Sequence, residues 1–205
     1  KHSGGNVVSL NSPTNAPGAA DVAFKLPNAD GSANQVIKTD GSGNLGFVAQ
    51  SIAGITEFDQ WYMTGNKSVN GDITSSLARN NQAGAAAQIG TGMTESSGIF
   101  TFPSTGKYLV IGNPIFQLKD YDNANLTTQV TTNNSSYTVH GYAMDGNNGS
   151  GSRAGSATSF SFIDVTDTSQ VKVKFGVESL GTDSYLQGAT GAIYTTFLFI
   201  RIGDT

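Results

Sequence analysis

Alternating apolar and polar positions dominate the chain from residue 55 onward, and they predict a succession of β-strands. Residues 171–178 carry valine or phenylalanine at every second position, with lysine, glycine or glutamate between them. Residues 126–131 alternate in the same way. This period of two is typical of strands that bury one face. Since no segment shows a convincing apolar stripe of helical spacing, we expect an all-β protein.

Three further runs, residues 55–64, 106–118 and 192–202, carry apolar side chains on both faces. In a single sandwich only one face of each sheet meets the core, so a sheet built from these runs needs a second cover. A neighbouring subunit would supply that cover, and loops of the same chain are the alternative. We expect the interface between subunits to use large side chains of these runs: Trp61, Tyr108, Val110, Phe116, Tyr194, Leu198 and Ile200.

The stretch at residues 98–110, GIFTFPSTGKYLV, has the pattern of strand, sharp turn and strand. Phe100 and Phe102 alternate ahead of Pro103, and a second apolar run opens at Tyr108. Proline cannot donate to a central ladder, and Gly106 frees the backbone of the turn. The local pattern therefore predicts a β-hairpin.

Residues 1–54 differ in kind from the rest of the chain. Pro13, Pro17 and Pro27 exclude a continuous helix, and only short apolar runs separate them, at 7–10 and 22–26. Turn signals follow at 30–32 and 40–44. Strands this short bury no core alone, but three copies wound together would cover one another's apolar edges. We therefore expect a fibre neck or shaft at 1–54 and a head domain at 55–205, with a flexible linker as the alternative for the first segment.

Composition narrows the class of partner. Charged residues are 13% of the chain, about half of the usual ~25%, so serine, threonine, asparagine and glutamine must supply the polar surface. Such surfaces are common in extracellular and virion all-β proteins. A net charge of −4 argues against nucleic acid. The absence of cysteine excludes disulfides, and no run approaches the ~18 apolar residues of a membrane span, so we expect no membrane insertion.

Candidate catalytic residues are few. A hydrolytic triad needs a histidine base, and the chain offers His2 near its first residue and His140 in a strand-like run. Two acidic pairs, one at 120 and 122 and the other at 164 and 167, lie in segments with ordinary turn composition. We expect no enzymatic activity.

Two loop segments are candidates for binding. Several hard oxygen donors at 120–125 suggest a calcium site formed by Asp120, Asp122 and Asn125. The segment lacks the glycine and the closing glutamate of an EF-hand. No other cofactor is expected. The long polar loop at 144–158 contains one cation and, together with a second loop at 183–185, is the candidate receptor-binding surface, although a merely flexible loop is the alternative. Its candidate residues are Asp145, Asn147, Asn148, Arg153, Asp183 and Tyr185.

Two resemblances add to this reading. Residues 26–48, LPNADGSANQVIKTDGSGNLGFV, resemble a segment that recurs in tail-fibre proteins of tailed bacteriophages, which implies a trimeric fibre neck. The pattern Gly98-x-Phe100-Thr101-x-Pro103-x-x-Gly106-x-Tyr108 is similar to the signature of the globular head of complement subcomponent q. Residues 194–200, YTTFLFI, resemble that family's last strand. The family shares an antiparallel jelly-roll sandwich with the tumour necrosis factor superfamily, and the resemblance implies a trimer whose axis is lined by the sheet of the first, third and last strands.

Together these features lead to one expected function with two alternatives. We expect a homotrimeric virion fibre protein, located on a tail fibre or another surface appendage and therefore extracellular. Its jelly-roll head would bind a host cell-surface glycan or protein, and its N-terminal side would contact other virion proteins. The alternatives are a structural virion decoration or connector protein without receptor binding, and a non-viral trimeric surface or secreted jelly-roll protein.

Overall fold

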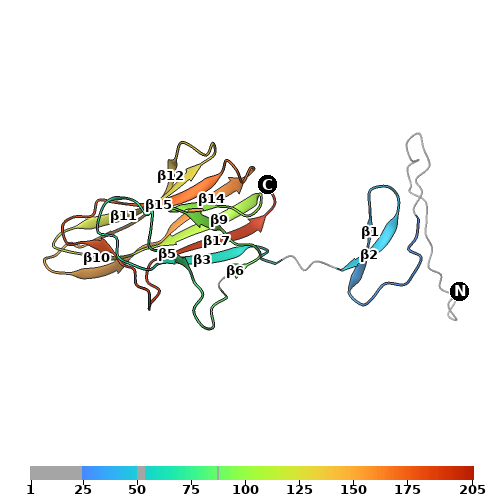
Figure 1. Cartoon of the computed structure of the whole chain (residues 1–205), viewed down its shortest axis with the longest axis horizontal. Helices are drawn as coiled ribbons and strands as arrows, with labels where there is room; N and C mark the ends of the chain where they lie inside the picture. The colour runs from blue at the N-terminus through green and yellow to red at the C-terminus, as the bar shows by residue number, and fades with distance from the viewer. Residues whose placement is uncertain (1–24, 50–53, 87) are drawn as a thin grey trace. The chain divides into compact units, whose positions relative to one another are not determined.

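The computed structural model describes residues 25–49, 54–86 and 88–205, and the regular elements within these ranges are all β-strands (Figure 1). Its contacts divide the chain into two units, Lys1–Ala53 and Gly54–Thr205. His2 and the predicted run at 7–10 lie outside the described residues. Across the described ranges, no helix has the length and apolar character that a membrane span requires. The expectation of an all-β protein with antiparallel sheets is confirmed.

The described part of the first unit is a two-stranded hairpin of β1 (Gln35–Thr39) and β2 (Leu45–Ala49). Its turn is organised by Asp40, whose Oδ1 accepts hydrogen bonds from the backbone N–H groups of Ser42 and Asn44, at 2.8 and 3.1 Å. The side-chain amide of Asn44 also donates to Asp40, and this bond lowers the pKa of the carboxyl below its ordinary value. The predicted turn at 40–44 therefore connects these two strands.

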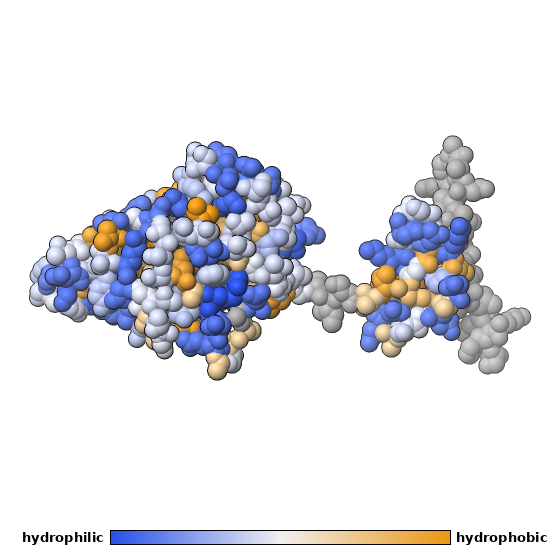
Figure 2. Space-filling view, in the orientation of Figure 1, coloured by the Kyte–Doolittle hydropathy of each residue, from blue (hydrophilic) through white to orange (hydrophobic). Residues whose placement is uncertain are grey.

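The apolar side chains of this hairpin remain at its surface. Ile37 is 56% exposed, and hydrophobic residues are visible on the outside of this unit in Figure 2. Burying apolar surface is the main favourable contribution to folding, and the described residues of this unit bury little of it. The large side chains left exposed are Leu26, Val36, Ile37 and Val48.

The second unit contains two six-stranded sheets and one small sheet. The first, called here the β9 sheet, has the order β14-β9-β17-β3-β5, with β6 also paired to β3. It places β9, β17 and β3 side by side, so most of the three runs that are apolar on both faces shares one sheet, as expected. The end of the run at 106–118 departs from that expectation, because residues 115–118 form β10 of the small sheet. Its strands are β3 (Phe58–Met63), β5 (Leu77–Arg79), β6 (Gln88–Ile89), β9 (Gly106–Asn113), β14 (Ser159–Val165) and β17 (Thr196–Gly203).

The second large sheet, called the β11 sheet, has the order β12-β11-β15-β8-β7, with β4 paired to β15. Its strands are β4 (Gly71–Asp72), β7 (Thr94–Ser96), β8 (Ile99–Thr101), β11 (Asn123–Thr131), β12 (Thr138–Gly146) and β15 (Lys172–Glu178). The small sheet has the order β13-β10-β16. Its strands are β10 (Ile115–Leu118), β13 (Arg153–Ser156) and β16 (Tyr185–Leu186).

An aromatic cluster joins the two large sheets. Phe100 of β8 and Phe175 of β15 come from the β11 sheet, whereas Trp61, Phe197 and Phe199 come from the β9 sheet. The rings of Phe175 and Phe197 lie 4.2 Å apart between centroids, and those of Phe100 and Phe199 lie 4.9 Å apart. Contacts of this kind stabilise a core beyond the area that they bury. The cluster therefore marks the centre of the sandwich.

The prediction of a hairpin at residues 98–110 is wrong. Its first strand, β8, pairs with β7 and β15 in one sheet, while its second strand, β9, pairs with β14 and β17 in the other. Both edges of each strand are already occupied, so the two strands cannot pair with each other. The turn carries the chain across the core, and the ring of Phe102 packs at 4.7 Å on that of Tyr108. Burial raises the pKa of the Tyr108 hydroxyl above its ordinary value.

Gly98 is fixed by its surroundings, and replacing it with alanine is expected to destabilise the second unit by about 2–4 kcal/mol. Its φ is +83°, and an added Cβ would overlap the carbonyl oxygen of Ile73. Gly71 is the matched control, because its φ is +112° but nothing lies within 4 Å of an added Cβ. The Gly71→Ala variant should show the backbone strain alone, about 1 kcal/mol. Equal losses in urea unfolding would contradict the steric explanation.

Candidate functional site

An apolar surface covers the outer side of the β9 sheet. Strand register aligns its side chains in two rows that cross adjacent strands. One row consists of Phe162, Leu109, Ile200 and Phe58, and the other of Phe160, Ile111, Leu198 and Gln60. The two phenylalanines of β14 are 63% and 59% exposed, and the other apolar members are half-buried. The name "apolar face" is used below for Phe58, Leu109, Ile111, Phe160, Phe162, Leu198 and Ile200.

The alternation along each strand explains why this face is apolar. In β9, Tyr108 and Val110 point into the core, so Leu109 and Ile111 must point outward. In β14, Ser161 and Ile163 are buried, so Phe160 and Phe162, which alternate with them, lie outside. The sequence therefore places large hydrophobic residues where a solvated strand would have polar ones.

Four of the seven residues predicted for the subunit interface need correction. Trp61, Tyr108, Val110 and Phe116 are buried in the core of their own chain, so their side chains are not available to another chain. Both faces of these strands are apolar, so the sequence pattern alone does not tell which face is the inner one. Leu198 and Ile200 lie on the apolar face, and Tyr194, which is 40% exposed, precedes β17.

The candidate receptor-binding loop is held by its own hydrogen bonds. Asn147 is 6% exposed, and its side-chain amide donates to the carbonyl oxygens of Leu118 and Gly151. The guanidinium of Arg153 forms an ion pair with Asp145 at 2.9 Å. These three predicted residues, Asp145, Asn147 and Arg153, therefore shape the loop, while Asn148 and the Arg153 side chain, which is 48% exposed, remain accessible.

The second predicted loop lies beside the first. Asp122 connects the two, because its backbone oxygen accepts from the N–H of Asn147 and its Oδ2 accepts from the N–H of Gly181. Asp183 is exposed and has a φ of +64°. Tyr185 is half-buried in β16, where it pairs with Gln117 of β10. The structure thus brings together two loops that are about 30 residues apart in the sequence.

Tyr121 is an exposed residue of this loop cluster that sequence reasoning missed. Its side chain is 72% exposed, and its φ of +58° is uncommon for a residue other than glycine or asparagine. Its N–H donates to the carbonyl oxygen of Gly149 at 3.0 Å, which holds it beside the 145–153 loop. A strained backbone that presents an aromatic ring to solvent is a recurrent feature of functional loops. A tyrosine between two aspartates was the signal available in the sequence.

The carboxylates of two predicted calcium ligands are used in hydrogen bonds to other loops. The carboxylates of Asp120 and Asp122 accept hydrogen bonds from the backbone N–H groups of Gly151 and Gly181, and Asn125 lies on β11. In the described ranges no group of three or more acidic or histidine side chains is placed to hold an ion. Asp120 and Asp122 therefore tie loops together. His140 is exposed on β12, and Asp167 accepts from the backbone N–H and the hydroxyl of Ser169, as expected for a turn.

Comparison with known proteins identifies the fold. No protein-family model and no curated protein sequence matches the chain. Among solved structures, murine APRIL at pH 5.0 matches with a TM-score of 0.54 and 10% identity, covering 71% of this chain and 98% of that one. The structure of Eiger TNF from S. frugiperda matches with a TM-score of 0.53 and 14% identity, covering 72% of this chain and 94% of that one.

A second structure of murine APRIL, at pH 8.5, gives a TM-score of 0.52 at 10% identity, again over 71% of this chain. These shares are close to the part of the chain that lies in Gly54–Thr205. Identities of 10–14% establish the fold and nothing finer. The second unit of this protein is a jelly roll of the tumour necrosis factor type.

Proposed function

We propose that this protein is a homotrimeric fibre protein of a bacteriophage virion, whose jelly-roll head attaches to the host cell surface. The observation that carries the proposal is the apolar face. Large contiguous hydrophobic patches are rare on soluble monomers and usually mark an interface. Three heads that pack this face around a common axis would cover it completely, without leaving a copy unpaired.

The hairpin of β1 and β2 supports the same assembly. Its exposed valine and isoleucine side chains have no cover among the described residues, and a two-stranded hairpin alone is marginally stable. Three hairpins wound together would bury these side chains against one another. The assignment to a virion rests on the resemblance of residues 26–48 to phage tail-fibre segments, and the expected contacts with other virion proteins lie on this side of the chain.

The loop cluster around Tyr121 is the surface proposed for host attachment. An exposed tyrosine with nearby amide and carboxylate groups suits glycans and polar protein surfaces, since its ring stacks and its hydroxyl forms hydrogen bonds. Each contact is weak, but a rigid head with three copies gains avidity from simultaneous binding.

Replacing Tyr121 with asparagine is expected to weaken adhesion at least tenfold without weakening the fold. Asparagine tolerates positive φ, so the free energy of unfolding should stay the same or rise by a few tenths of a kcal/mol. The measurement is the binding of labelled protein to a panel of bacterial strains, together with thermal unfolding. Tyr142→Asn is the matched control, because Tyr142 is 52% exposed on β12.

Two measurements, the native mass of the protein and its adhesion to cells, distinguish the proposal from its alternatives. A native mass of three chains with adhesion to a bacterial strain is the expected result. A trimer that adheres to no cell would favour a structural virion protein, and a trimer that adheres to animal cells alone would favour a non-viral surface protein. A stable monomer would remove the basis of the proposal.

A further inference from the structure

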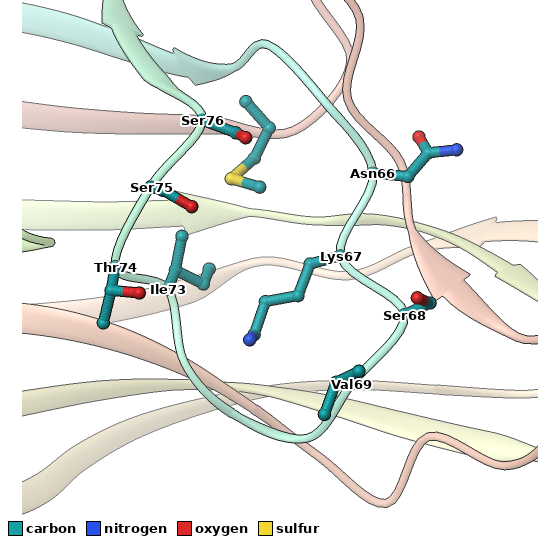
Figure 3. Close-up of a pocket in the computed structure, with 9 residues that line it drawn as sticks. Asn66, Lys67, Ser68, Val69, Ile73, Thr74, Ser75 and Ser76 are labelled. Atoms are coloured by element: carbon teal, nitrogen blue, oxygen red, sulfur yellow. The ribbon is translucent and has the colours of Figure 1, made fainter.

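The loop that follows β3 surrounds a pocket of about 220 Å³ (Figure 3). All of the residues that line it belong to the segment 63–76, and none of them is acidic. Two walls face each other across the pocket, one at 66–69 and the other at 73–76. The pocket has no part in the assembly or in the loop cluster described above.

Hydrogen bonds to neighbouring strands hold both walls. The backbone of Lys67 exchanges two hydrogen bonds with Leu186 of β16, at 3.0 and 2.9 Å. In the opposite wall, the N–H of Ile73 donates to the carbonyl oxygen of Phe175 at 2.8 Å. The side chain of Asn70 donates to and accepts from the backbone of Leu180, which fixes the connection between the walls. The pocket is therefore formed in advance of any ligand.

The groups that the pocket offers to a ligand are one cation, several hydroxyls and the exposed side chain of Val69. Met63 and Ile73 line it from the core and are 1% and 2% exposed. Figure 3 shows the side chain of Lys67 extending between the walls, with the hydroxyls of Ser75 and Ser76 turned toward the same space. Within the described ranges, the Lys67 ammonium has no carboxylate within 4.0 Å and no hydrogen-bond acceptor. By contrast, Arg79, Arg153, Lys174 and Arg201 form ion pairs.

We propose that this pocket binds one acidic sugar residue of a cell-surface glycan, with the Lys67 ammonium on its anionic group. The assignment to a glycan rests on the proposed attachment function. Ammonium-to-anion hydrogen bonds are about twice as strong as neutral ones, and a half-buried lysine gains more from them than an exposed one. Serine and threonine hydroxyls both donate and accept, as the hydroxyls of a sugar ring require.

The size of the pocket limits the ligand to a single residue. Sites for drug-sized molecules occupy about 300–1,000 Å³, so this pocket suits a monosaccharide. The exposed side chain of Val69 would contact the apolar face of the ring, while the hydroxyls of Thr74, Ser75 and Ser76 reach its edge. One lysine selects one negative charge, which a carboxylate or a sulfate would supply equally.

The test is titration of the 205-residue chain with three probes: glucuronate, glucose 6-sulfate and methyl glucoside. Protein-observed NMR is expected to show binding of an anionic probe, with shifts at Lys67, Ile73 and Ser75. The neutral glucoside should bind at least tenfold more weakly. Preference for glucuronate identifies a carboxylated sugar and preference for the sulfate a sulfated one. Equal binding of all three, or shifts confined to other loops, would overturn the proposal.

Lys67→Gln is expected to weaken binding of the anionic probe at least tenfold and to leave the fold intact, because the backbone of Lys67, not its side chain, pairs with Leu186. Lys172→Gln is the matched control, since Lys172 is also half-buried but lies on β15. Binding unchanged in Lys67→Gln would overturn the proposal. Wild-type protein that adheres to cells but binds no sugar would overturn the proposed sugar site and leave the proposed attachment function standing. Protein that binds the sugar but adheres to no cell would support the sugar site and overturn the proposed attachment function.

Discussion

Replacing Leu198 with glutamate is expected to convert the proposed trimer into single chains of 21.2 kDa. Leu198 lies in the middle of the apolar face, between Ile111 of β9 and Gln60 of β3. A three-fold axis would bring three copies of the new carboxylate together in a space without water. Desolvation of each charge and repulsion among the three both oppose assembly. Sedimentation velocity at micromolar concentration measures the result.

The matched control for this variant is Ile99→Glu. Ile99 is a half-buried isoleucine on the β11 sheet, and it pairs in register with Lys174, so a glutamate there gains a favourable cross-strand neighbour. The control should remain trimeric, and circular dichroism should show native strand content in both variants. A Leu198→Glu protein that stays trimeric would assign the assembly to the first unit and not to the apolar face.

Replacing Asp59 with alanine is expected to lower the free energy of unfolding by about 2–4 kcal/mol. Asp59 is 1% exposed, and its carboxylate accepts from the indole N–H of Trp61, the guanidinium of Arg79 and the backbone N–H of Met93. Arg79 also donates to the carbonyl oxygen of Met93 and stacks over the Trp61 ring at 4.9 Å. Removing the carboxylate leaves three donors without their acceptor. The Arg79 side chain is 31% exposed, so its guanidinium regains part of its hydration, and this limits the loss.

Asp204→Ala is the matched control for the buried ion pair. Asp204 pairs with Arg201 at 2.5 Å, but its side chain is 91% exposed, so urea unfolding should show no measurable loss. The double variant Asp59→Ala with Arg79→Met should recover part of the lost stability, because it removes the unpaired guanidinium. Equal losses in Asp59→Ala and Asp204→Ala would show that burial does not decide the contribution of these pairs.

Part of the candidate site was predictable from the sequence. The two-faced runs identified the sheet that carries the apolar face, and the polar segments at 144–158 and 183–185 lie together. Neither segment is wholly a loop, because residues 144–146 end β12, residues 153–156 form β13 and Tyr185 begins β16. The roles of individual residues were not predictable. Arg153 was expected to face a ligand but pairs with Asp145, and Asp120 and Asp122 were expected to hold calcium but accept backbone hydrogen bonds. These partners come from other segments, so no local pattern indicates them.

The pocket at Lys67 gave no signal in the sequence at all. Its residues have ordinary loop composition, and the pocket exists because Leu186, Phe175 and Leu180 hold the loop open from three other segments. A lysine among serines predicts a solvated loop. Its position in a preformed pocket depends on contacts more than 100 residues away in the sequence.

The all-β class of this protein, and the strands that are apolar on both sides, follow from the local residue pattern, because side-chain alternation along a strand is a local property with a period of two. The tertiary structure alone decided which strands pair. Residues 98–110 read locally as a hairpin, yet β8 and β9 belong to different sheets, since each strand pairs with partners from distant parts of the chain. It also decided which apolar side of β9 became the core, placing Tyr108 and Val110 inside and leaving Leu109 and Ile111 for the apolar face.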